Sequence, residues 1–309
     1  MPPDIPGTVR PASPEDVPGL VRLYLACDVV DIGPPDSDEE DILWRWRTSE
    51  FDLAADTWVV EAGDSLLAYG WVFEGLADVR VHPDARGRGI GSHLLALSER
   101  RAAAQGSRDG MIRQNVTNRN PGARALLEAH GYVGSHHYSR LEIELTERPA
   151  VPPPPSGMTV RTYERGPDDE PVHAAFNRAW SQYEGDRWAP EPLDRWLEQL
   201  ESETFDPATW HLAIEGDEVL AFSLCDQYED LGWVQYLGTV PEARGRGLGR
   251  LMLLQSFAAY WDRGTKRVGL TVASENLPAA RALYDSVGMV EVLRYDNLKK
   301  PMGDIAPPS

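Results

Sequence analysis

The chain carries one unusual glycine-rich hexapeptide twice. RGRGIG occupies residues 86-91, and RGRGLG occupies residues 244-249. Similar sequences at a fixed place in the two halves of a chain indicate an internal duplication, so this chain is expected to fold as two copies of one unit. The rest of the sequence supports that prediction.

The segments before the two hexapeptides match in order. TVRPASPEDVPGLVRLY at 8-24 and TVRTYERGPDDEPVHAAF at 159-176 each combine a β-like run, an acidic turn and an amphipathic helix. WVVEAGDSLLAYGWVF at 58-73 and WHLAIEGDEVLAFSLC at 210-225 each predict a β-hairpin that turns at Gly-Asp.

The segments after the hexapeptides also match. The predicted pairs are the helices Gly91 to Gly106 and Gly249 to Gly264, the strands 111-118 and 268-274, and the helices that carry 123-132 and 280-289. A hairpin followed by a strand, helix, strand crossover predicts an α/β fold in each half, with a mixed central sheet flanked by helices.

A proline-rich segment separates the two copies. The sequence TERPAVPPPPSG at 146-157 holds four consecutive prolines, which favour a stiff, extended linker. With 309 residues the chain is long enough for roughly two domains. We therefore predict domains at residues 1-148 and 158-309, joined by a linker at 149-157.

The charge balance favours some partners over others. The sequence has 30 Lys and Arg against 49 Asp and Glu, a formal net charge of -19. Such a field repels nucleic acid and anionic membranes and suits a cationic or amine substrate, although solubility alone would also explain it. We expect no nucleic-acid or membrane partner, and a phosphate-bearing ligand would need a local binding feature.

Cysteine usage and hydropathy bear on the compartment. Cys27 and Cys225 lie far apart and match no metal-binding or redox spacing. The N-terminal residues have no signal-like apolar core, and LMLLQSFAAYW at 251-261 is too short to span a bilayer. The expectation is a cytoplasmic protein without a bound metal.

The hexapeptides themselves suit an anion. Glycines permit positive φ angles that curl a loop, and the start of a helix presents unpaired N–H groups with a partial positive charge. The Gly-x-Gly-x-Gly spacing differs from the patterns of P-loops and dinucleotide-binding folds. On this motif alone, a tight strand-to-helix turn with solvated arginines is the favoured interpretation.

The wider segments resemble a known signature. VRVHPDARGRGIGSHLL at 79-95 and LGTVPEARGRGLGRLML at 237-253 are similar to the acetyl-CoA signature of the GNAT superfamily of N-acetyltransferases, in which Arg/Gln-x-x-Gly-x-Gly/Ala follows a strand and a Pro-containing turn. The resemblance implies two tandem GNAT acyl-CoA N-acyltransferase domains that use acetyl-CoA.

The resemblance also implies which residues bind the cofactor. In that family the loop amides and the helix start hold the CoA pyrophosphate, and the preceding strand pairs with the pantetheine arm and polarises the acetyl carbonyl. The matching positions of the second half are Leu237, Gly238, Thr239, Arg244, Gly245, Arg246, Gly247, Leu248, Gly249, Arg250 and Asn276. Those of the first half are Val79, Arg80, Val81, Arg86, Gly87, Arg88, Gly89, Ile90, Gly91, Ser92 and Asn120.

The two halves differ at the position of the general acid. GNAT proteins often carry a tyrosine in the last core helix that protonates the departing CoA thiolate, and Tyr284 matches it. The first half has Leu127 there, which cannot donate a proton. We therefore predict a catalytic second half and a possibly non-catalytic first half, with core packing as the alternative role of Tyr284.

The general base stays open at this level. Asp78 precedes the first loop, Glu229 and Asp230 precede the strand of the second half, and a water chain could also carry the proton. For the acceptor, the segment 177-190 offers aromatic and acidic side chains that suit a cationic amine. The candidate substrate residues are Trp180, Tyr183, Glu184 and Trp188, unless this segment is only an amphipathic helix and its loop.

The function that follows is acetyl transfer from acetyl-CoA to the amine of a small molecule by direct attack, in a monomer or homodimer. Mycothiol synthase-like proteins also have two GNAT halves, and they are an alternative. That family carries a glutamate at the start of the strand before the loop, where this chain has Trp233. A protein that binds or senses acyl-CoA with little catalysis is the second alternative.

Overall fold

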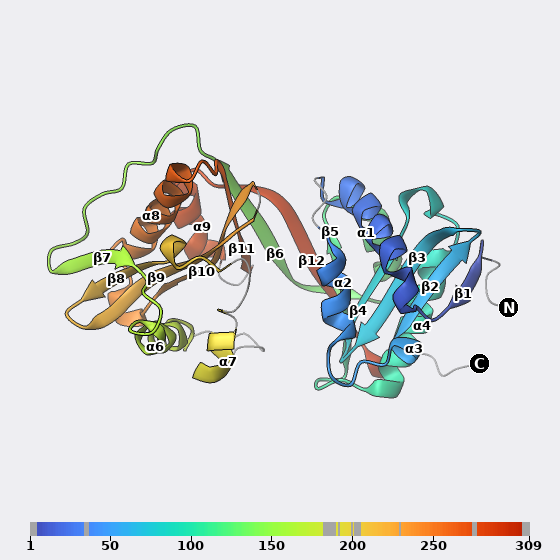
Figure 1. The fold of residues 1–309 in the computed structure, drawn as a ribbon. Helices are drawn as coiled ribbons and strands as arrows, with labels where there is room; N and C mark the ends of the chain where they lie inside the picture. Colours follow the sequence, from blue (N-terminus) through green and yellow to red (C-terminus); the bar gives the residue numbers. More distant parts are fainter. Residues whose placement is uncertain are drawn as a thin grey trace. The chain divides into compact units, whose positions relative to one another are not determined.

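The fold is given by a computed structural model that describes residues 5–33, 37–181, 190, 192–198, 200, 205–228, 230–273 and 277–304. It divides into two compact units (Figure 1). Unit 1 is Met1–Tyr138 with Leu293–Ser309, and unit 2 is Ser139–Val292.

In the described residues, the first repeat contains six strands and five α-helices. Its strands are β1 (Thr8–Arg10), β2 (Thr57–Ala62), β3 (Ser65–Phe73), β4 (Leu76–Val81), β5 (Met111–Thr117) and β6 (Val133–Glu144). Its helices are α1 (Val17–Asp31), α2 (Glu39–Trp46), α3 (Leu53–Asp56), α4 (Ile90–Gln105) and α5 (Pro121–Ala129).

The second repeat follows the same order. Its strands are β7 (Met158–Thr162), β8 (His211–Glu215), β9 (Glu218–Gln227), β10 (Leu231–Thr239), β11 (Arg267–Ala273) and β12 (Val290–Pro301). Its helices are α6 (Asp169–Trp180), α7 (Leu193–Glu198), α8 (Leu248–Asp262) and α9 (Leu277–Ser286).

The last strand of the second repeat completes the sheet of unit 1. β12 pairs antiparallel with β5, from Tyr295 opposite Thr117 to Pro301 opposite Met111. The last strand of the first repeat, β6, lies next to β11 of unit 2. The chain therefore leaves unit 1 within β6 and returns within β12. The predicted boundaries at 148 and 158 follow the repeat and do not include this exchange of strands.

The sheet of unit 1 has the order β1-β2-β3-β4-β5-β12 and is covered on both faces. Neighbouring residues of one strand point to opposite faces. Val59 packs with Leu20 and Leu23 of α1, whereas Val60 packs with Ile90 and Leu94 of α4. The helices α1 and α4 thus cover opposite faces of this sheet. The last turn of α1 and the first turn of α4 both lie near the end of β4.

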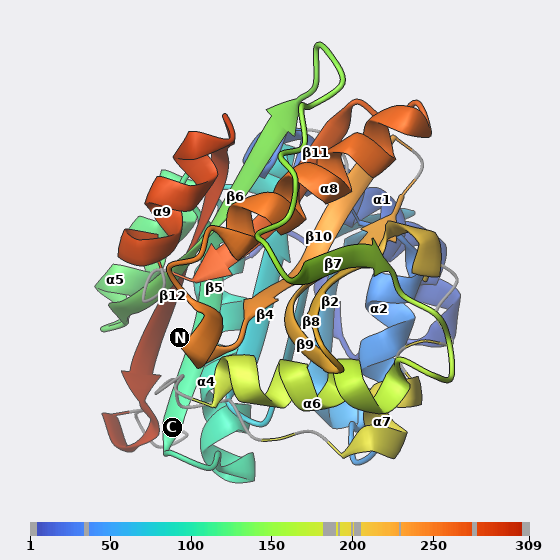
Figure 2. The ribbon, with the colours of Figure 1, turned by 90° about the vertical axis from the view of Figure 1, so that its left-hand side faces the viewer.

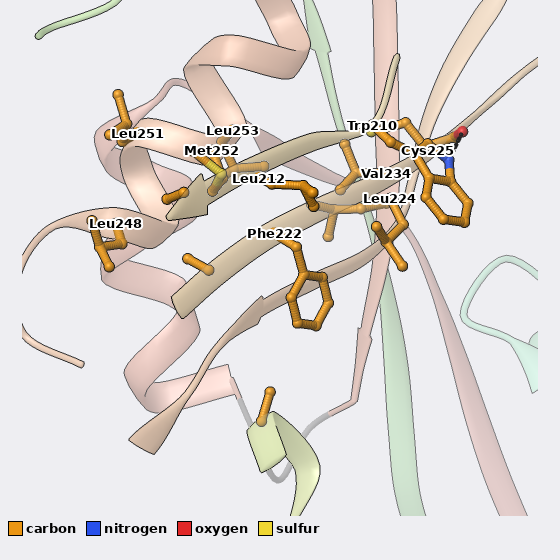
Figure 3. Packing of buried hydrophobic residues seen from close by; sticks show 14 of the residues in the cluster. Trp210, Leu212, Phe222, Leu224, Cys225, Val234, Leu248, Leu251, Met252 and Leu253 are labelled. Carbon is orange, nitrogen blue, oxygen red and sulfur yellow. Dashed lines mark hydrogen bonds between the residues drawn. The ribbon is translucent and has the colours of Figure 1, made fainter. Parts of the chain in front are cut away.

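The sheet of unit 2 has the order β6-β11-β10-β9-β8-β7. Figure 2, viewed from the side of unit 2, shows α6 and α8 on opposite sides of its strands. On β9, Phe222 packs against Phe176 of α6, while the next residue, Ser223, accepts a hydrogen bond from Ser256 of α8. Figure 3 shows Phe222 pointing away from Met252 and Leu253 of α8, as the alternation requires.

The predicted hairpins and helix starts are confirmed. β2 and β3 pair antiparallel across a turn at residues 63–64, and β8 and β9 pair across residues 216–217.

Each repeat also opens with a matched ion pair. Arg10 contacts Asp16 at 2.7 Å, and Arg161 contacts Asp168 at 2.5 Å, so the same arginine–aspartate bridge joins the first strand to the start of α1 and of α6.

Candidate active site

The two glycine-rich loops adopt the same conformation. Gly87 and Gly89 have φ angles of 74° and 83°, and Gly245 and Gly247 both have 78°. These left-handed values are costly for any residue with a Cβ atom, which explains why glycine stands at alternate positions. Each loop leads from a short 3-10 turn into a helix whose N-cap is Gly89 or Gly247.

Both loops present a helix N-terminus to solvent-accessible space. The first N–H groups of α4 and α8 have no partner within their own helix, and each helix places the positive end of its dipole there. Gly89 is half-buried and Gly247 is exposed, so an anion can reach these groups. The arrangement can bind a phosphate group without a basic side chain.

Beside each loop, two parallel strands diverge. In unit 1, β4 pairs with β5 at Leu76 and Arg113, and in unit 2, β10 pairs with β11 from Leu231 to Trp233. A register shift in β10 follows at Val234 and Tyr236. Beyond these points no further pairing of β4 with β5 or of β10 with β11 is seen among the described residues.

The divergence opens a cavity of about 670 Å³ in unit 1. Its walls come from β4, the glycine-rich loop, β5 and α5. They include Val79, Arg80, Val81, Arg86, Gly87, Gly89, Gly91, Ser92 and Asn120, all predicted to bind the cofactor. The structure therefore brings most of the predicted first-half residues together around one cleft, although Arg88 and Ile90 do not line it.

The signature arginines hold the loops in place. Arg86 donates from Nε to the carbonyl oxygen of Val81 at 3.1 Å, and Arg244 donates from Nε to that of Thr239 at 3.3 Å. Arg86 also makes a bidentate ion pair with Asp31 at 2.7 and 2.8 Å. Both guanidinium groups thus tie the loop to the end of the preceding strand, a supporting role that the sequence did not indicate.

The other predicted loop side chains have their own partners or face the core. Arg88 donates to the carbonyl oxygen of Asp84, and Arg246 pairs with Glu215 at 2.8 Å. Ile90 and Leu248 are buried in the hydrophobic core, and Arg250 is exposed on α8. Any contact of Ile90 and Leu248 with a ligand would come from their backbone N–H groups.

Asn120 positions the start of α5 next to the cleft. Its Oδ1 accepts a hydrogen bond from the Ala123 N–H at 2.9 Å, and its Nδ2 donates to Asp31 at 3.0 Å. Asp31 therefore links this asparagine to the signature arginine Arg86. The matching Asn276 lies outside the described residues.

Leu127 and Tyr284 occupy equivalent positions. The carbonyl oxygen of Leu127 accepts from the N–H of Tyr132 at 3.0 Å, and that of Tyr284 accepts from the N–H of Met289 at 3.1 Å. Leu127 lines the cleft of unit 1. The repeat therefore predicts that Tyr284 borders the corresponding cleft between β10 and β11.

The environment of Tyr284 is apolar. The side chain belongs to the hydrophobic core of unit 2 and is 8% exposed. Burial raises the pKa of Tyr284 to about 12. The phenol consequently keeps its proton at neutral pH and can act as a donor.

A comparable environment acts on a thiol in unit 1. Cys27 lines the cleft there, and burial raises the pKa of its thiol to about 11. A thiolate that forms in such surroundings is a stronger base than in water, because burial disfavours the charged form. Burial therefore raises the pKa of the tyrosine and that of the thiol by similar amounts.

The face of β4 toward α1 carries an ion-pair network. Arg80 donates from Nη1 to Asp28 at 3.0 Å and from Nε to Asp78 at 3.0 Å, and the ring of Tyr24 lies 4.2 Å from its guanidinium carbon. Asp28 is fully buried. Arg80 was expected to contribute its strand backbone to the cofactor, and its side chain joins β4 to α1 through these contacts.

The second half has an aromatic cluster at the same place. Gly238 stands in the position of Arg80, and a Cβ atom on Gly238 would come within 2.2 Å of the Phe222 ring. Trp180 stacks on Phe176 with ring centroids 4.7 Å apart and lies 5.9 Å from Phe222. Tyr236, the counterpart of Asp78, meets Phe176 edge-on at 5.0 Å.

This cluster gives Trp180 a definite place. The predicted substrate residue lies at the end of α6 and packs on Phe176 of that helix and on Tyr236 of β10. The other predicted substrate residues, Tyr183, Glu184 and Trp188, lie outside the described residues.

Sequence reasoning missed several residues of the first cleft. Asp31 and Cys27 lie one turn apart on α1 and line the cavity, although Cys27 matched no site pattern. Gln114 on β5 is 5% exposed, also lines the cavity, and its Nε2 has no hydrogen-bond partner in the described structure. The weak available signal was the pair Asp28 and Asp31 on one face of an otherwise apolar helix.

The cleft of unit 1 fits acyl-CoA. The loop N–H groups suit the pyrophosphate, the free strand backbone suits an amide-bearing arm, and the orphaned Gln114 amide suits a carbonyl oxygen. Among the described residues, no group of His, Cys, Asp and Glu side chains could hold a metal ion. The described helices include none long and apolar enough to cross a membrane.

The chain is similar in sequence and in fold to known proteins. The profile of the Acetyltransferase (GNAT) family matches residues 18–132 and 172–289. A mycothiol acetyltransferase of Kineococcus radiotolerans is 35% identical over 240 residues, which cover 76% of this chain and 74% of that protein. The mycothiol acetyltransferase of Kytococcus sedentarius is 30% identical, covering 93% of this chain and 95% of that protein.

Solved structures with a similar fold point to the same family. The GCN5-related N-acetyltransferase from Sphaerobacter thermophilus has a TM-score of 0.80 and 28% identity, covering 96% of this chain and 95% of that one. A tandem GNAT protein from the clavulanic acid biosynthesis pathway has a TM-score of 0.73 at 18% identity, covering 98% and 99%, and shows the shared fold. The chain is an acyltransferase that belongs to the GNAT acetyltransferase family, with two GNAT domains in tandem.

Proposed function

We propose that the protein transfers the acetyl group of acetyl-CoA to the amine of a small-molecule acceptor, and that the second half is the one that turns over. The observation that carries this proposal is that Leu127, which lines the cleft of unit 1, has Tyr284 as its counterpart in the second repeat. Both halves have a glycine-rich loop, but at this position only the second half has a side chain that can donate a proton, which supports Tyr284 as the general acid.

Acetyl-CoA supplies the activated acetyl thioester. The N–H groups of Gly247, Leu248 and Gly249 bind the pyrophosphate at the start of α8. The edge of β10 that faces β11, from Leu237 to Thr239, orients the arm and donates to the thioester oxygen, where negative charge develops during attack. Gly249 keeps α8 close to α9, since a Cβ atom there would lie 3.2 Å from Leu283.

Tyr284 holds its proton at Oη until the carbon–sulfur bond breaks and then gives it to the leaving sulfur. With its raised pKa the phenol stays protonated over the working pH range, as a proton donor requires. The aromatic wall of Trp180, Phe176 and Tyr236 excludes water from the acceptor side and suits an amine near its ring faces.

Identity to mycothiol acetyltransferases favours a second, narrower candidate. An acceptor of the mycothiol type is supported by the sequence identity of 28% to 35% to those relatives. Against it, Trp233 stands where those proteins were expected to carry a glutamate, and its ring lies 5.2 Å from the guanidinium of Arg140. An acyl-CoA-binding protein with little catalysis is the remaining alternative.

The test is release of free thiol from acetyl-CoA with a panel of amines that includes the acceptor of mycothiol acetyltransferases. Wild type is expected to turn over at least one amine, and Tyr284→Phe to lose roughly 100-fold in kcat with little change in KM for acetyl-CoA. Leu127→Phe, at the matched position of the first half, serves as the control and should keep its activity. Binding of CoA without turnover of any amine would favour the sensor instead.

A further inference from the structure

The exchanged strands β6 and β12 are equivalent in their backbone. β12 ends beside β5, where the N–H of Met302 donates to the carbonyl oxygen of Gly110 at 2.8 Å. β6 ends beside β11 with the matched bond from the N–H of Leu145 to the carbonyl oxygen of Lys266, at 2.7 Å. Both strands have 12 residues. The backbone alone therefore does not determine which strand joins which unit.

Beneath β12 the core of unit 1 contains a buried ion pair. Lys300 lies opposite Ile112 of β5, and its Nζ donates to Oε1 of Glu99 on α4 at 3.1 Å. The two side chains are 11% and 9% exposed. His130 lies 3.7 Å from Glu99, and the centroid of the Tyr132 ring lies 5.8 Å from the Nζ. Buried charges thus join β12 to a helix of unit 1.

The equivalent positions of unit 2 are apolar. Glu99 and Phe257 stand at the same place after the two hexapeptides, on α4 and α8. Lys300 and Ile143 stand at the same place before the matched hydrogen bonds that end β12 and β6. Phe257 is 1% exposed, and Ile143 packs against the hydrophobic core to which Phe257 belongs.

Each strand therefore suits one core and not the other. With β6 beside β5, Ile143 would replace Lys300, and the buried carboxylate of Glu99 would keep only His130, which is charged only when protonated. With β12 beside β11, the ammonium of Lys300 would be buried near Phe257. A buried charge without a partner costs far more free energy than an apolar side chain at the same place.

We propose that the ion pair of Lys300 and Glu99 determines which strand joins which unit, so that β12 completes unit 1 and β6 completes unit 2. The pair need not stabilise the fold by itself, because taking both charges out of water offsets much of their attraction. It acts by making the opposite arrangement unfavourable. In coiled coils a single buried polar residue fixes the register in the same way.

The choice of strand affects both repeats. In the sheet of unit 2, β11 lies between β6 and β10. By holding β12 in unit 1, the ion pair leaves β6 available to unit 2. This inference concerns the fold and does not depend on which half turns over.

The experiment traps the strand that lies beside β5 in the full chain. Met111 of β5 lies opposite Pro301 of β12, and Glu144 is the residue of β6 equivalent to Pro301. A chain with Met111→Cys, Pro301→Cys and Glu144→Cys can form a β5–β12 or a β5–β6 disulfide. The chain is refolded under reducing conditions and then oxidised, and peptide mass spectrometry measures the ratio of the two bonds. With the native ion pair, the β5–β12 disulfide should be the main product.

Two further sets of substitutions in this chain move the charges. Ile143→Lys with Lys300→Ile places the ammonium on β6 and should raise the share of the β5–β6 disulfide at least about tenfold. Adding Glu99→Phe and Phe257→Glu moves the carboxylate to unit 2. β6 then meets its charge partner there, so the β5–β12 disulfide should again be the main product.

A matched pair of single variants, without added cysteines, tests the same contact through stability. Lys300→Ile leaves Glu99 without its lysine and should lower the midpoint of chemical denaturation. Lys299 points to the opposite face of β12 and has no ion pair among the described residues, so Lys299→Ile should leave the midpoint almost unchanged. This comparison holds even where the charge-exchange variants do not fold.

Three results would overturn the proposal. The first is an unchanged disulfide ratio after the exchange of Ile143 and Lys300. The second is a shifted ratio that the added Glu99→Phe and Phe257→Glu do not reverse. The third is an equal shift of the denaturation midpoint in Lys300→Ile and Lys299→Ile.

Discussion

Arg80 donates a hydrogen bond to the fully buried carboxylate of Asp28 at 3.0 Å, and the second repeat has Gly238 and Trp180 at the same two positions. In the first repeat an ion pair therefore occupies the face of β4 toward α1. In the second repeat stacked rings occupy the matching face of β10. The two halves share the cofactor loop but differ in what they offer an acceptor.

The first prediction concerns the stability of that ion pair. Asp28→Asn should lower the free energy of unfolding by about 2 kcal/mol, because it leaves the half-buried Arg80 with one carboxylate fewer. Chemical denaturation monitored by circular dichroism measures the change. Asp262→Asn removes the exposed partner of Arg148 and should cost much less, because solvent screens this pair. Equal costs for the two variants would contradict the assignment.

The second prediction concerns the cysteines. Burial raises the pKa of Cys27 to about 11 and that of Cys225 to about 12, so at pH 8 only on the order of one molecule in a thousand carries the Cys27 thiolate. A thiol-reactive dye should label the native chain very slowly and both cysteines promptly after unfolding. Because Cys27 lines the cleft and Cys225 does not, CoA should slow labelling of Cys27 alone.

The third prediction concerns acid. Arg161 holds the pKa of Asp168 below its ordinary value of 3.8, chiefly through their hydrogen bonds. A depressed pKa stabilises the fold above 3.8, and that stability is lost as the pH falls through the folded value. Arg161→Ala should lower the free energy of unfolding by about 1 to 2 kcal/mol at pH 6. The difference from wild type should shrink below pH 3.8, and a difference that grows there would refute the linkage.

The sequence predicted the duplication, the hairpins and the loop conformation because each depends on local patterns. Gly-Asp turns, alternating strands and left-handed glycines can be recognised within a few residues. The exchange of β6 and β12 could not be predicted, since both strands belong to one repeat pattern and either sheet offers them an equivalent partner.

Of the candidate site, only the backbone groups could be predicted from the sequence. Loop N–H groups follow from the glycine spacing, but the ion pair of Arg80 with Asp28 joins residues 52 positions apart that no local pattern connects. The role of Arg86 in tying its loop to Val81 and Asp31 likewise depends on tertiary contacts.

The central claim is that each half has a matched cofactor-binding loop, but that only the second half carries out acetyl transfer. Gly89 and Gly247 are the N-caps of α4 and α8, with φ angles of 83° and 78°, so valine at either position should distort its own loop by the same mechanism. Circular dichroism and denaturation of both variants check that each remains folded.

The decisive measurement is the rate of acetyl transfer by Gly247→Val and Gly89→Val, with the accepted amine and saturating acetyl-CoA. We expect Gly247→Val to lose roughly 100-fold in turnover and Gly89→Val to stay within about threefold of wild type. Loss of turnover in Gly89→Val with retention in Gly247→Val would place the chemistry in the first half and contradict the account.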